Sequence, residues 1–351
     1  MKLIIKKSFI IFVFIIFLFP HNKLYSTSLE ENIDDFGIIS LMYHRFNENK
    51  YPSTNIKVED FKKQLNIIEK QNIHFVNPKN FENELISNKM KRKILLTIDD
   101  AFLSFYDNAW PILKEKKIPF ILFVSTREVG SFNYMTWDQI KEVAKESFVE
   151  IGNHSHSHEY LVDEEINIIK EDIEKSINIF KNKLGKNSNF FSYPFGEYSL
   201  EFKELIKSLN FKYAFGQHSG VIDETKDLYE LPRFPINEKY GETKRFNSLM
   251  KTLPFKYKKI YPDEKYLLQN KNPPQVKINF YENIKNLKSL TCYSNEGNKW
   301  RPSDIKFENT NTLLINITEK FIGERGRINC SLRDPSSFWR WLGIQFVVSE
   351  K

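Results

Sequence analysis

The chain has 351 residues, of which 41% are hydrophobic and 15% aromatic. That length fits one large domain followed by a smaller one, and the hydrophobic content is enough to build a real core. The net charge of +7 comes from lysines scattered along the chain without a long basic block. This pattern argues against nucleic acid as a partner and leaves weak attraction to anionic glycans or phosphorylated envelope polymers.

The N-terminal segment predicts export. Lys2, Lys6 and Lys7 precede an apolar run from Phe9 to Phe19, which is the layout of a secretory signal peptide. A run of about eleven residues is too short for a comfortable transmembrane span. We therefore assign residues 1–26 to a signal peptide, with an uncleaved N-terminal anchor as the alternative. The expected product is a periplasmic, cell-envelope or secreted monomer, either free or held at a membrane.

Residues 27–254 alternate short apolar runs with helical patterns. The helical segment 166–184 carries apolar residues at steps of three and four and ends before Gly185, a typical C-cap. Strand–helix alternation predicts a parallel sheet covered by helices, open or closed into a barrel. The apolar runs are "GIISLMY" (37–43), "KILLTI" (93–98), "IPFILFV" (118–124), "FVEIG" (148–152), "NFFSY" (189–193), "KYAFG" (212–216) and "LYELPRFPI" (228–236).

Polar or special residues follow most of these runs at their C-terminal ends. In a (β/α) barrel those ends converge on one face, where active sites are built, so the pattern favours a barrel with a shared site. The residues concerned are Tyr43-His44, Asp99-Asp100, His154 to His158, Pro194 to Glu197, and Gln217-His218.

The composition and the pattern of apolar residues change after residue 254. Residues 255–274 are rich in Pro and Lys and predict a linker. Residues 275–351 contain short β-type runs with polar turns, which predict a small antiparallel β-sandwich as an accessory domain. Cys292 and Cys330 are the only cysteines, and in an oxidising compartment they most simply form one structural disulfide.

The stretch "IGNHSHSHEYL" places three histidines just past a predicted strand. Neutral imidazole is the commonest protein ligand for zinc and its neighbours, so metal binding is a better reading than a solvated His-rich loop. His154 and His158, four apart, share a face of a helical turn, whereas His156 points elsewhere. One aspartate of the pair Asp99-Asp100 can supply the anionic third ligand. Three ligands with open positions indicate a catalytic site suited to hydrolysis of an ester or amide.

Over about residues 37–250 the chain resembles the polysaccharide deacetylases of carbohydrate esterase family 4. The resemblance rests on "TIDDAF", "HSHSH" and "YPFG", which look like the first three motifs of that family. It implies an α/β fold with a distorted (β/α)7 barrel, and metal-dependent removal of N-acetyl groups from a polysaccharide or envelope glycan. It also implies a divalent metal, Zn first, with Co, Ni or Mn as alternatives.

The resemblance also assigns roles to residues. Asp99 would be the general base, and the metal ligands would be Asp100, His154 and His158. The backbone N–H of Phe195 would help to hold the developing oxyanion.

The chain departs from the family pattern at three places. The first motif usually ends Gly-Tyr and here reads Ala101-Phe102. The third motif commonly begins with Arg, and that position here is Ser192. A base beside a divalent ion needs a cationic partner, so we expect Arg233 in "LPRFP" to pair with Asp99, the alternative being a surface Arg between two prolines.

The third departure concerns the late His that usually serves as the general acid. His218 is the best candidate, against a merely structural role, and for His44 a supporting or packing role is as good a reading. Tyr193, Pro194 and Trp137 are expected to line the substrate pocket, with packing in the core as the alternative for Trp137.

Two other functions compete with deacetylation of a glycan. One is a glycan-binding exported protein with an inactive barrel, in which the C-terminal β-domain binds. The intact Asp-Asp and His-x3-His set argues against it. The other is a deacylase of the same mechanism that acts on a small or lipid-linked acetylated substrate, which the barrel motifs do not separate from the first.

Overall fold

The structure is a computed structural model that describes residues 36–87, 90–282 and 284–349. The predicted signal peptide or anchor, residues 1–26, lies outside the described residues. Within those ranges no helix combines the length and the apolar character that crossing a bilayer requires.

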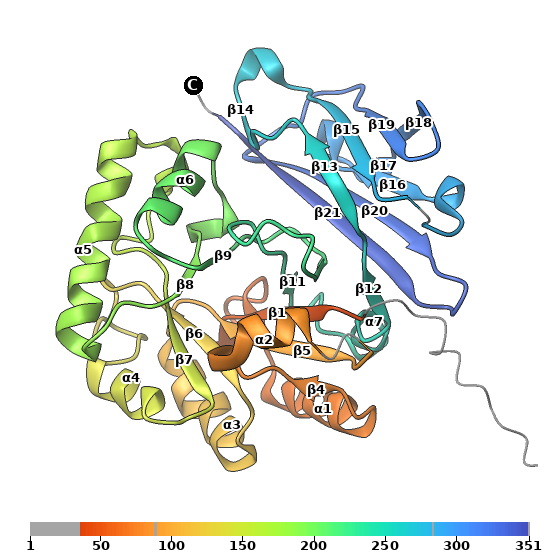
Figure 1. Cartoon of the computed structure of the whole chain (residues 1–351). Helices are drawn as coiled ribbons and strands as arrows, with labels where there is room; N and C mark the ends of the chain where they lie inside the picture. Colours follow the sequence, from red (N-terminus) through yellow and green to blue (C-terminus); the bar gives the residue numbers. More distant parts are fainter. Residues whose placement is uncertain (1–35, 88–89, 283, 350–351) are drawn as a thin grey trace, which may run out of the picture. The chain divides into compact units, whose positions relative to one another are not determined.

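A curled sheet of parallel strands forms the first part of the chain (Figure 1). Each of these strands is buried along its length, because helices cover the sheet on the outside. In spatial order the strands are β1 (Ile38–Tyr43), β5 (Lys93–Ile98), β6 (Phe120–Val124), β7 (Val149–Asn153), β8 (Phe190–Ser192) and β9 (Tyr213–Phe215).

A seventh segment joins the two edges of this sheet. Leu231 forms a parallel bridge with Phe215 of β9, and β11 (Phe234–Pro235) pairs in parallel with β1. The ring of strands is therefore closed through residues 231–235, which confirms the predicted distorted (β/α)7 barrel. Short strands add to it or lie beside it: β2 (Arg45–Phe46), β3 (Asn55–Ile56), β4 (His74–Phe75) and β10 (Val221–Ile222).

Amphipathic helices pack on the strands. In α5 the residues Ile169, Ile173 and Ile177 are buried, and the helix ends at Gly185 with φ 78°, as the periodicity predicts. The helices are α1 (Val58–Lys70), α2 (Phe81–Ile86), α3 (Trp110–Lys116), α4 (Trp137–Ala144), α5 (Ile166–Leu184), α6 (Leu200–Ser208) and α7 (Thr243–Leu249).

Two further sheets follow, and their facing apolar side chains form a separate core between them. The first contains β12 (Thr252–Pro254), β14 (Tyr266–Leu267), β16 (Thr291–Ser294), β17 (Arg301–Pro302), β20 (Arg325–Arg333) and β21 (Trp339–Val348). The second contains β13 (Tyr257–Tyr261), β15 (Gln275–Phe280), β18 (Asp304–Phe307) and β19 (Thr312–Asn316). We call residues 252–349 the C-terminal β-region.

The disulfide prediction is confirmed: Cys292 on β16 and Cys330 on β20 are bonded and lie directly opposite one another. The linker prediction is wrong, because residues 255–274 contain β13 and β14, which pair with β15 and β21. The Lys-rich stretch is the solvent side of an edge strand, where lysines are common, and its composition resembles that of a linker for this reason. Strands β12 and β14 run parallel to β21, in contrast to the antiparallel pairing of the other strands of this region.

Strand β21 approaches the barrel very closely. The Gly343 N–H donates to the Ser219 carbonyl at 2.6 Å, and a Cβ at position 343 would lie 2.4 Å from that oxygen. Only glycine permits this approach. The Gln345 amide also donates to the Gly196 carbonyl at 3.4 Å. These contacts hold one face of the C-terminal β-region beside the strand ends of the barrel.

Candidate active site

Three predicted metal ligands converge at the C-terminal ends of barrel strands. Asp100 follows β5, and His154 and His158 follow β7. One ligand atom from each of these residues lies within 4.8 Å of the other two. Asp100 Oδ1 is 3.4 Å from His154 Nε2 and 3.2 Å from His158 Nε2. His156 turns away, with its Nδ1 2.8 Å from Thr126 Oγ1, as predicted.

The donor set fits a divalent cation. His154 Nδ1 lies 2.6 Å from the Ser192 carbonyl, so this nitrogen carries the proton and Nε2 presents its lone pair to Asp100. Asp100 Oδ1 is buried, and no group among the described residues donates a well-aligned hydrogen bond to it. A buried carboxylate oxygen facing two imidazole nitrogens is the arrangement that a cation satisfies.

The electrostatics of Asp100 agree with this fit. Burial alone would raise the pKa of the Asp100 carboxyl, but the His158 and His154 imidazoles outweigh burial and hold that pKa well below its ordinary value. The carboxylate is therefore ionised at neutral pH, as a metal ligand must be.

The backbone around the site is strained. Five non-glycine residues there have positive φ: Asp100 (73°), Ala101 (55°), Ser155 (68°), His158 (54°) and Phe195 (58°). Such conformations cost roughly 1–3 kcal/mol each and cluster at functional sites, where they aim side chains. Position 101, where the family usually has Gly, is thus a left-handed position that Ala occupies at some cost.

Asp99 pairs with Arg233, as predicted. The Arg233 Nη1 lies 2.7 Å from Asp99 Oδ1, and both side chains are 0% exposed. The guanidinium also donates to Ser192 Oγ at 2.9 Å and to the Gly216 carbonyl at 3.0 Å. Ser192 Oγ in turn lies 3.4 Å from Asp99 Oδ2. The short Ser192 therefore leaves room for a guanidinium that arrives from the barrel-closing strand.

This pairing sets the ionisation of Asp99. Burial raises the pKa of the Asp99 carboxyl, whereas the Arg233 and His154 side chains lower it by more, so the pKa lies below its ordinary value. Asp99 Oδ2 is 4.0 Å from His154 Nε2, which places this carboxylate at the border of the three metal ligands.

A cavity of about 810 Å³ opens onto the ligands, and both candidate acids line it. Burial lowers the pKa of His218 to about 3, and Lys265 and Lys226 add to that effect. The pKa of His44 also lies below its ordinary value, because burial outweighs the opposing effect of the Asp100 and Asp99 carboxylates. His44 follows β1 directly and faces both aspartates, and this position after a strand was its signal in the sequence.

Three predicted pocket residues lie elsewhere. Tyr193 is fully buried and donates its hydroxyl to the Tyr229 carbonyl at 3.0 Å. Side chains alternate along a strand, so Ser192 faces Asp99 and Tyr193 faces the core beneath α6. Pro194 is buried in the following turn. Trp137 packs edge-on against Phe180 at 6.3 Å. None of the three is among the cavity-lining residues, and Phe195 of the same motif is.

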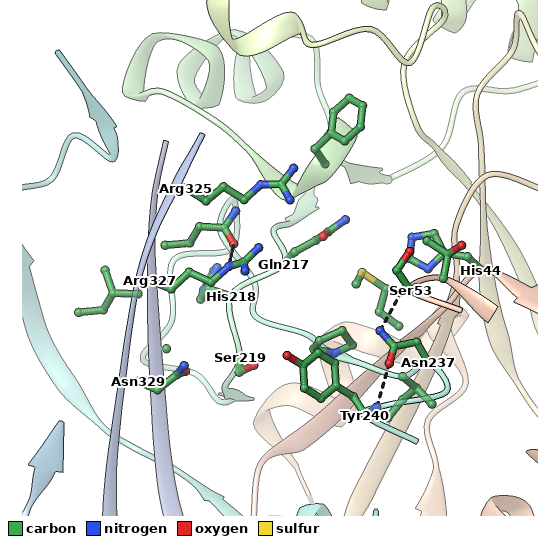
Figure 2. A pocket seen from close by; sticks show the side chains of 18 of the residues that line it. His44, Ser53, Gln217, His218, Ser219, Asn237, Tyr240, Arg325, Arg327 and Asn329 are labelled. Atoms are coloured by element: carbon green, nitrogen blue, oxygen red, sulfur yellow. Dashed lines mark hydrogen bonds between the residues drawn. The ribbon is translucent and has the colours of Figure 1, made fainter. Parts of the chain in front are cut away.

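The C-terminal β-region supplies a second wall of the cavity, which we did not predict (Figure 2). Alternate residues in "RGRINCSLR" are polar, which was the available signal in the sequence. The wall includes Arg325, Arg327, Asn329 and Ser331 of β20 and Trp341, Gly343 and Gln345 of β21.

The sequence of the barrel is similar to those of known polysaccharide deacetylases. Residues 87–214 match the family model described as polysaccharide deacetylase. The poly-beta-1,6-N-acetyl-D-glucosamine N-deacetylase of Staphylococcus epidermidis is 25% identical in an alignment of 228 positions that covers 61% of this chain and 77% of that protein. The protein of the same name from Staphylococcus aureus (strain MSSA476) is 24% identical in an alignment of 214 positions that covers 57% of this chain and 73% of that protein.

Solved structures show the same fold. IcaB from Ammonifex degensii superposes with a TM-score of 0.56 at 25% identity, over 61% of this chain and 97% of that chain. The deacetylase PplD from Streptococcus pyogenes, solved in complex with acetate, gives a TM-score of 0.56 at 23% identity, over 62% of this chain and 99% of its own. Residues 87–214 of this chain thus form a polysaccharide deacetylase domain, and the barrel that contains them has the fold of the solved deacetylases.

Proposed function

We propose that this protein is a metal-dependent N-deacetylase of an N-acetylhexosamine-containing polysaccharide or envelope glycan. The main observation behind the proposal is that two adjacent carboxylates have different partners. Asp100 faces two imidazole nitrogens, while its neighbour Asp99 is paired with Arg233 at 2.7 Å. One carboxylate is thus suited to ligation and the other to proton transfer. The curated relatives, which are N-deacetylases of poly-beta-1,6-N-acetyl-D-glucosamine by name, support the substrate class.

The ligands Asp100, His154 and His158 would hold a divalent cation, with Zn first among the candidates because imidazole and carboxylate suit it. When bound, such a cation supplies Lewis acidity, which polarises the acetamide carbonyl and lowers the pKa of the attacking water. The Ser192 carbonyl keeps the His154 ring in the ligating tautomer.

Asp99 accepts the proton of the attacking water. Its Oδ1 is held by Arg233. Its Oδ2 accepts a long hydrogen bond from Ser192 Oγ at 3.4 Å, lies 4.0 Å from His154 Nε2, and is the oxygen available to take a proton. The low pKa of Asp99 keeps this base ionised at neutral pH. The planar guanidinium fixes the orientation of the carboxylate.

The remaining steps concern the oxyanion and the leaving amine. The water oxygen bonds to the acetamide carbon, and the backbone N–H of Phe195 helps to hold the negative charge on the former carbonyl oxygen. The C–N bond then breaks, the nitrogen takes up a proton, and acetate and a free amine result. His44 is the proposed donor of that proton and His218 the alternative, since both line the cavity.

We also propose that the protein is exported. The Cys292–Cys330 disulfide supports an oxidising compartment, where such bonds persist. The basic and then apolar N-terminal layout points the same way.

Acetate release tests the proposed function. The metal-loaded full chain is incubated with β-1,6-linked N-acetylglucosamine oligomers, chitooligomers and peptidoglycan glycan strands. We expect acetate from at least one of them, and Asp99→Asn should lower turnover by on the order of a hundredfold or more while the metal stays bound. Asp107→Asn, an exposed carboxylate on the same barrel, is the matched control.

Either of two results would contradict the proposal. The first is no acetate from any acetylated glycan with a full complement of metal. The second is Asp99→Asn protein that turns over at the unmodified rate. Comparing His44→Ala with His218→Ala on the reactive substrate then identifies the proton donor, because only its loss should be relieved by substrates with a less basic leaving group.

A further inference from the structure

One face of β20 is turned toward the cavity. Side chains alternate along a strand, so Ile328, Cys330 and Leu332 enter the core of the C-terminal β-region. The alternate residues form the barrel-facing row, which we define as Arg325, Arg327, Asn329 and Ser331. Figure 2 shows Arg325 and Arg327 reaching from this strand toward Gln217 and His218 of the barrel.

The arginines of this cavity are unevenly neutralised. Arg325 forms an ion pair with Glu197. Arg327 donates through Nε to Gln345 at 3.3 Å, and Arg245 donates through Nη1 to the Tyr240 carbonyl at 2.5 Å and lies over the ring of that residue. Throughout the part of the chain that the structure describes, no carboxylate forms an ion pair with Arg327 or Arg245. Both side chains are half-buried, so two partly desolvated cations line the cavity without a counter-ion.

The row lies close to the metal ligands. The Arg325 guanidinium carbon is 6.0 Å from the Phe195 ring, and that ring lies 4.9 Å from the ring of His158. Arg327 and Arg245 line the same cavity as His158, so a group bound there would belong to the same glycan as the reacting acetamide. Two aromatic residues that also line the cavity, Tyr293 and Trp300, are 46% and 52% exposed and offer flat apolar faces for sugar rings.

We propose that Arg327, with Arg245, binds a carboxylate or phosphate on the glycan that carries the N-acetylated sugar, so that the substrate is an anionic glycan. This inference rests on the proposed function and names its substrate class. A partly desolvated guanidinium without a counter-ion is costly, and a bidentate oxyanion satisfies it. The free amine of the product is a cation at neutral pH, and the same arginines would repel it and favour its release.

The barrel-facing row also disfavours neutral and cationic glycans as substrates. A neutral N-acetylglucosamine polymer offers only hydroxyl and amide oxygens, which form weaker hydrogen bonds to guanidinium than an oxyanion does. A polymer already rich in free amines would bring like charge against Arg245 and Arg327. The charge of this wall therefore selects among glycans that the barrel by itself would treat alike.

Calorimetric titration of the metal-loaded full chain tests the inference, with Asp99→Asn introduced so that substrate is not consumed. The ligands are three N-acetylated oligosaccharides of equal length: a neutral β-1,6-linked N-acetylglucosamine oligomer, one with lactyl carboxylates on alternate sugars, and one with phosphate groups. We expect an anionic oligomer to bind about tenfold more tightly than the neutral one, the size of one charged hydrogen-bonded contact. The carboxylate and phosphate arms identify the anion.

Substitutions locate the effect. Arg327→Gln should remove about this tenfold preference while the affinity for the neutral oligomer stays within about twofold, and Arg327→Lys should restore part of it. Lys306→Gln, an exposed lysine on β18 away from the cavity, is the control for a general loss of charge and should change neither affinity. If Asp99→Asn protein does not fold, as judged by near-UV circular dichroism, chelator-treated unmodified chain replaces it.

Two results would overturn the inference: equal or tighter binding of the neutral oligomer, or an unchanged anionic preference in Arg327→Gln. Its failure is distinct from failure of the proposed function. If the protein releases acetate from the neutral oligomer and shows no preference for anionic oligomers, the proposed N-deacetylase activity holds. Only the proposed specificity for anionic glycans is then rejected.

Discussion

The barrel and the C-terminal β-region both line one cavity, but the buried arginine beside the metal ligands differs from Arg327 on the opposite wall. In the barrel, the buried Arg233 is matched by the buried Asp99 at 2.7 Å, and Asp100 faces two imidazoles. In the β-region, Arg327 faces the same cavity with a single amide partner, Gln345. The Asp99–Arg233 ion pair fixes the orientation and the ionisation of the proposed base. The Arg327 guanidinium has no counter-ion among the described residues and can bind an anionic ligand. In our proposal the barrel supplies the residues of the reaction, and the β-region contributes to the choice of substrate.

The largest expected effect is loss of the bound metal, which should follow from changes in the barrel and not from changes in the β-region. His158→Ala should lose most of the bound metal and nearly all turnover, because two remaining ligands hold a cation poorly. His156→Ala, which removes a neighbouring imidazole bonded to Thr126, should keep both. Arg327→Gln should also keep stoichiometric metal, since the ligands come from the barrel alone. Elemental analysis of the three variants decides, and stoichiometric metal in His158→Ala would defeat the ligand assignment.

The next effect concerns pH. The Asp99 carboxyl is buried, and Arg233 is the strongest of the groups that lower its pKa. Arg233→Gln removes the cation that offsets the effect of burial on Asp99, so the pKa of Asp99 should rise. The acid limb of the kcat/KM profile should therefore move to higher pH. Activity at acidic pH is lost first because the base must be ionised.

Arg233→Lys keeps the charge but loses the planar fork, so it should shift the acid limb less and still lower turnover, with metal content unchanged. Arg327→Gln should leave the acid limb in place. An acid limb that does not move in Arg233→Gln would mean that Arg233 serves the fold and has no role in the ionisation of Asp99.

A smaller effect separates the two regions by stability. The Cys292–Cys330 bond closes a loop with a sequence separation of 38, so replacing both cysteines by Ala should cost about 2–4 kcal/mol in the free energy of unfolding. Because β20 carries one of these cysteines, KM should rise more than kcat falls. Denaturant unfolding and steady-state kinetics measure the two effects. An equal loss of kcat with unchanged KM would show that the β-region does not set substrate binding.

The smallest effect tests backbone strain at the site. Ala101 has φ 55°, which glycine adopts without a Cβ penalty, so Ala101→Gly should stabilise the fold by about 0.5–1 kcal/mol. Ala144→Gly, in the last turn of α4, is the contrasting control and should destabilise. Thermal unfolding of the two variants provides the measurement, and destabilisation by Ala101→Gly would show that Cβ packing outweighs the strain.

The local pattern of the sequence was sufficient for the barrel, for the convergence of Asp100, His154 and His158 and for the disulfide. Strand–helix alternation and the spacing of His154 and His158 are short-range features, and strand ends of a barrel necessarily meet at one face. The Asp99–Arg233 pair was also predictable, because closure brings the last strand beside the first and a buried carboxylate needs a cation.

Other features depended on tertiary structure. Whether Tyr193 or Ser192 faces the site follows from the register of a three-residue strand, which its flanking sequence does not specify. The Lys-rich stretch after residue 254 has the composition of a linker, and only pairing with β15 and β21 makes it part of two sheets. The second wall of the cavity depends on the docking of β21 against Ser219, a contact between residues more than one hundred positions apart. Local propensity carries no information on such a contact, because its free energy comes from packing that forms only when both regions are folded.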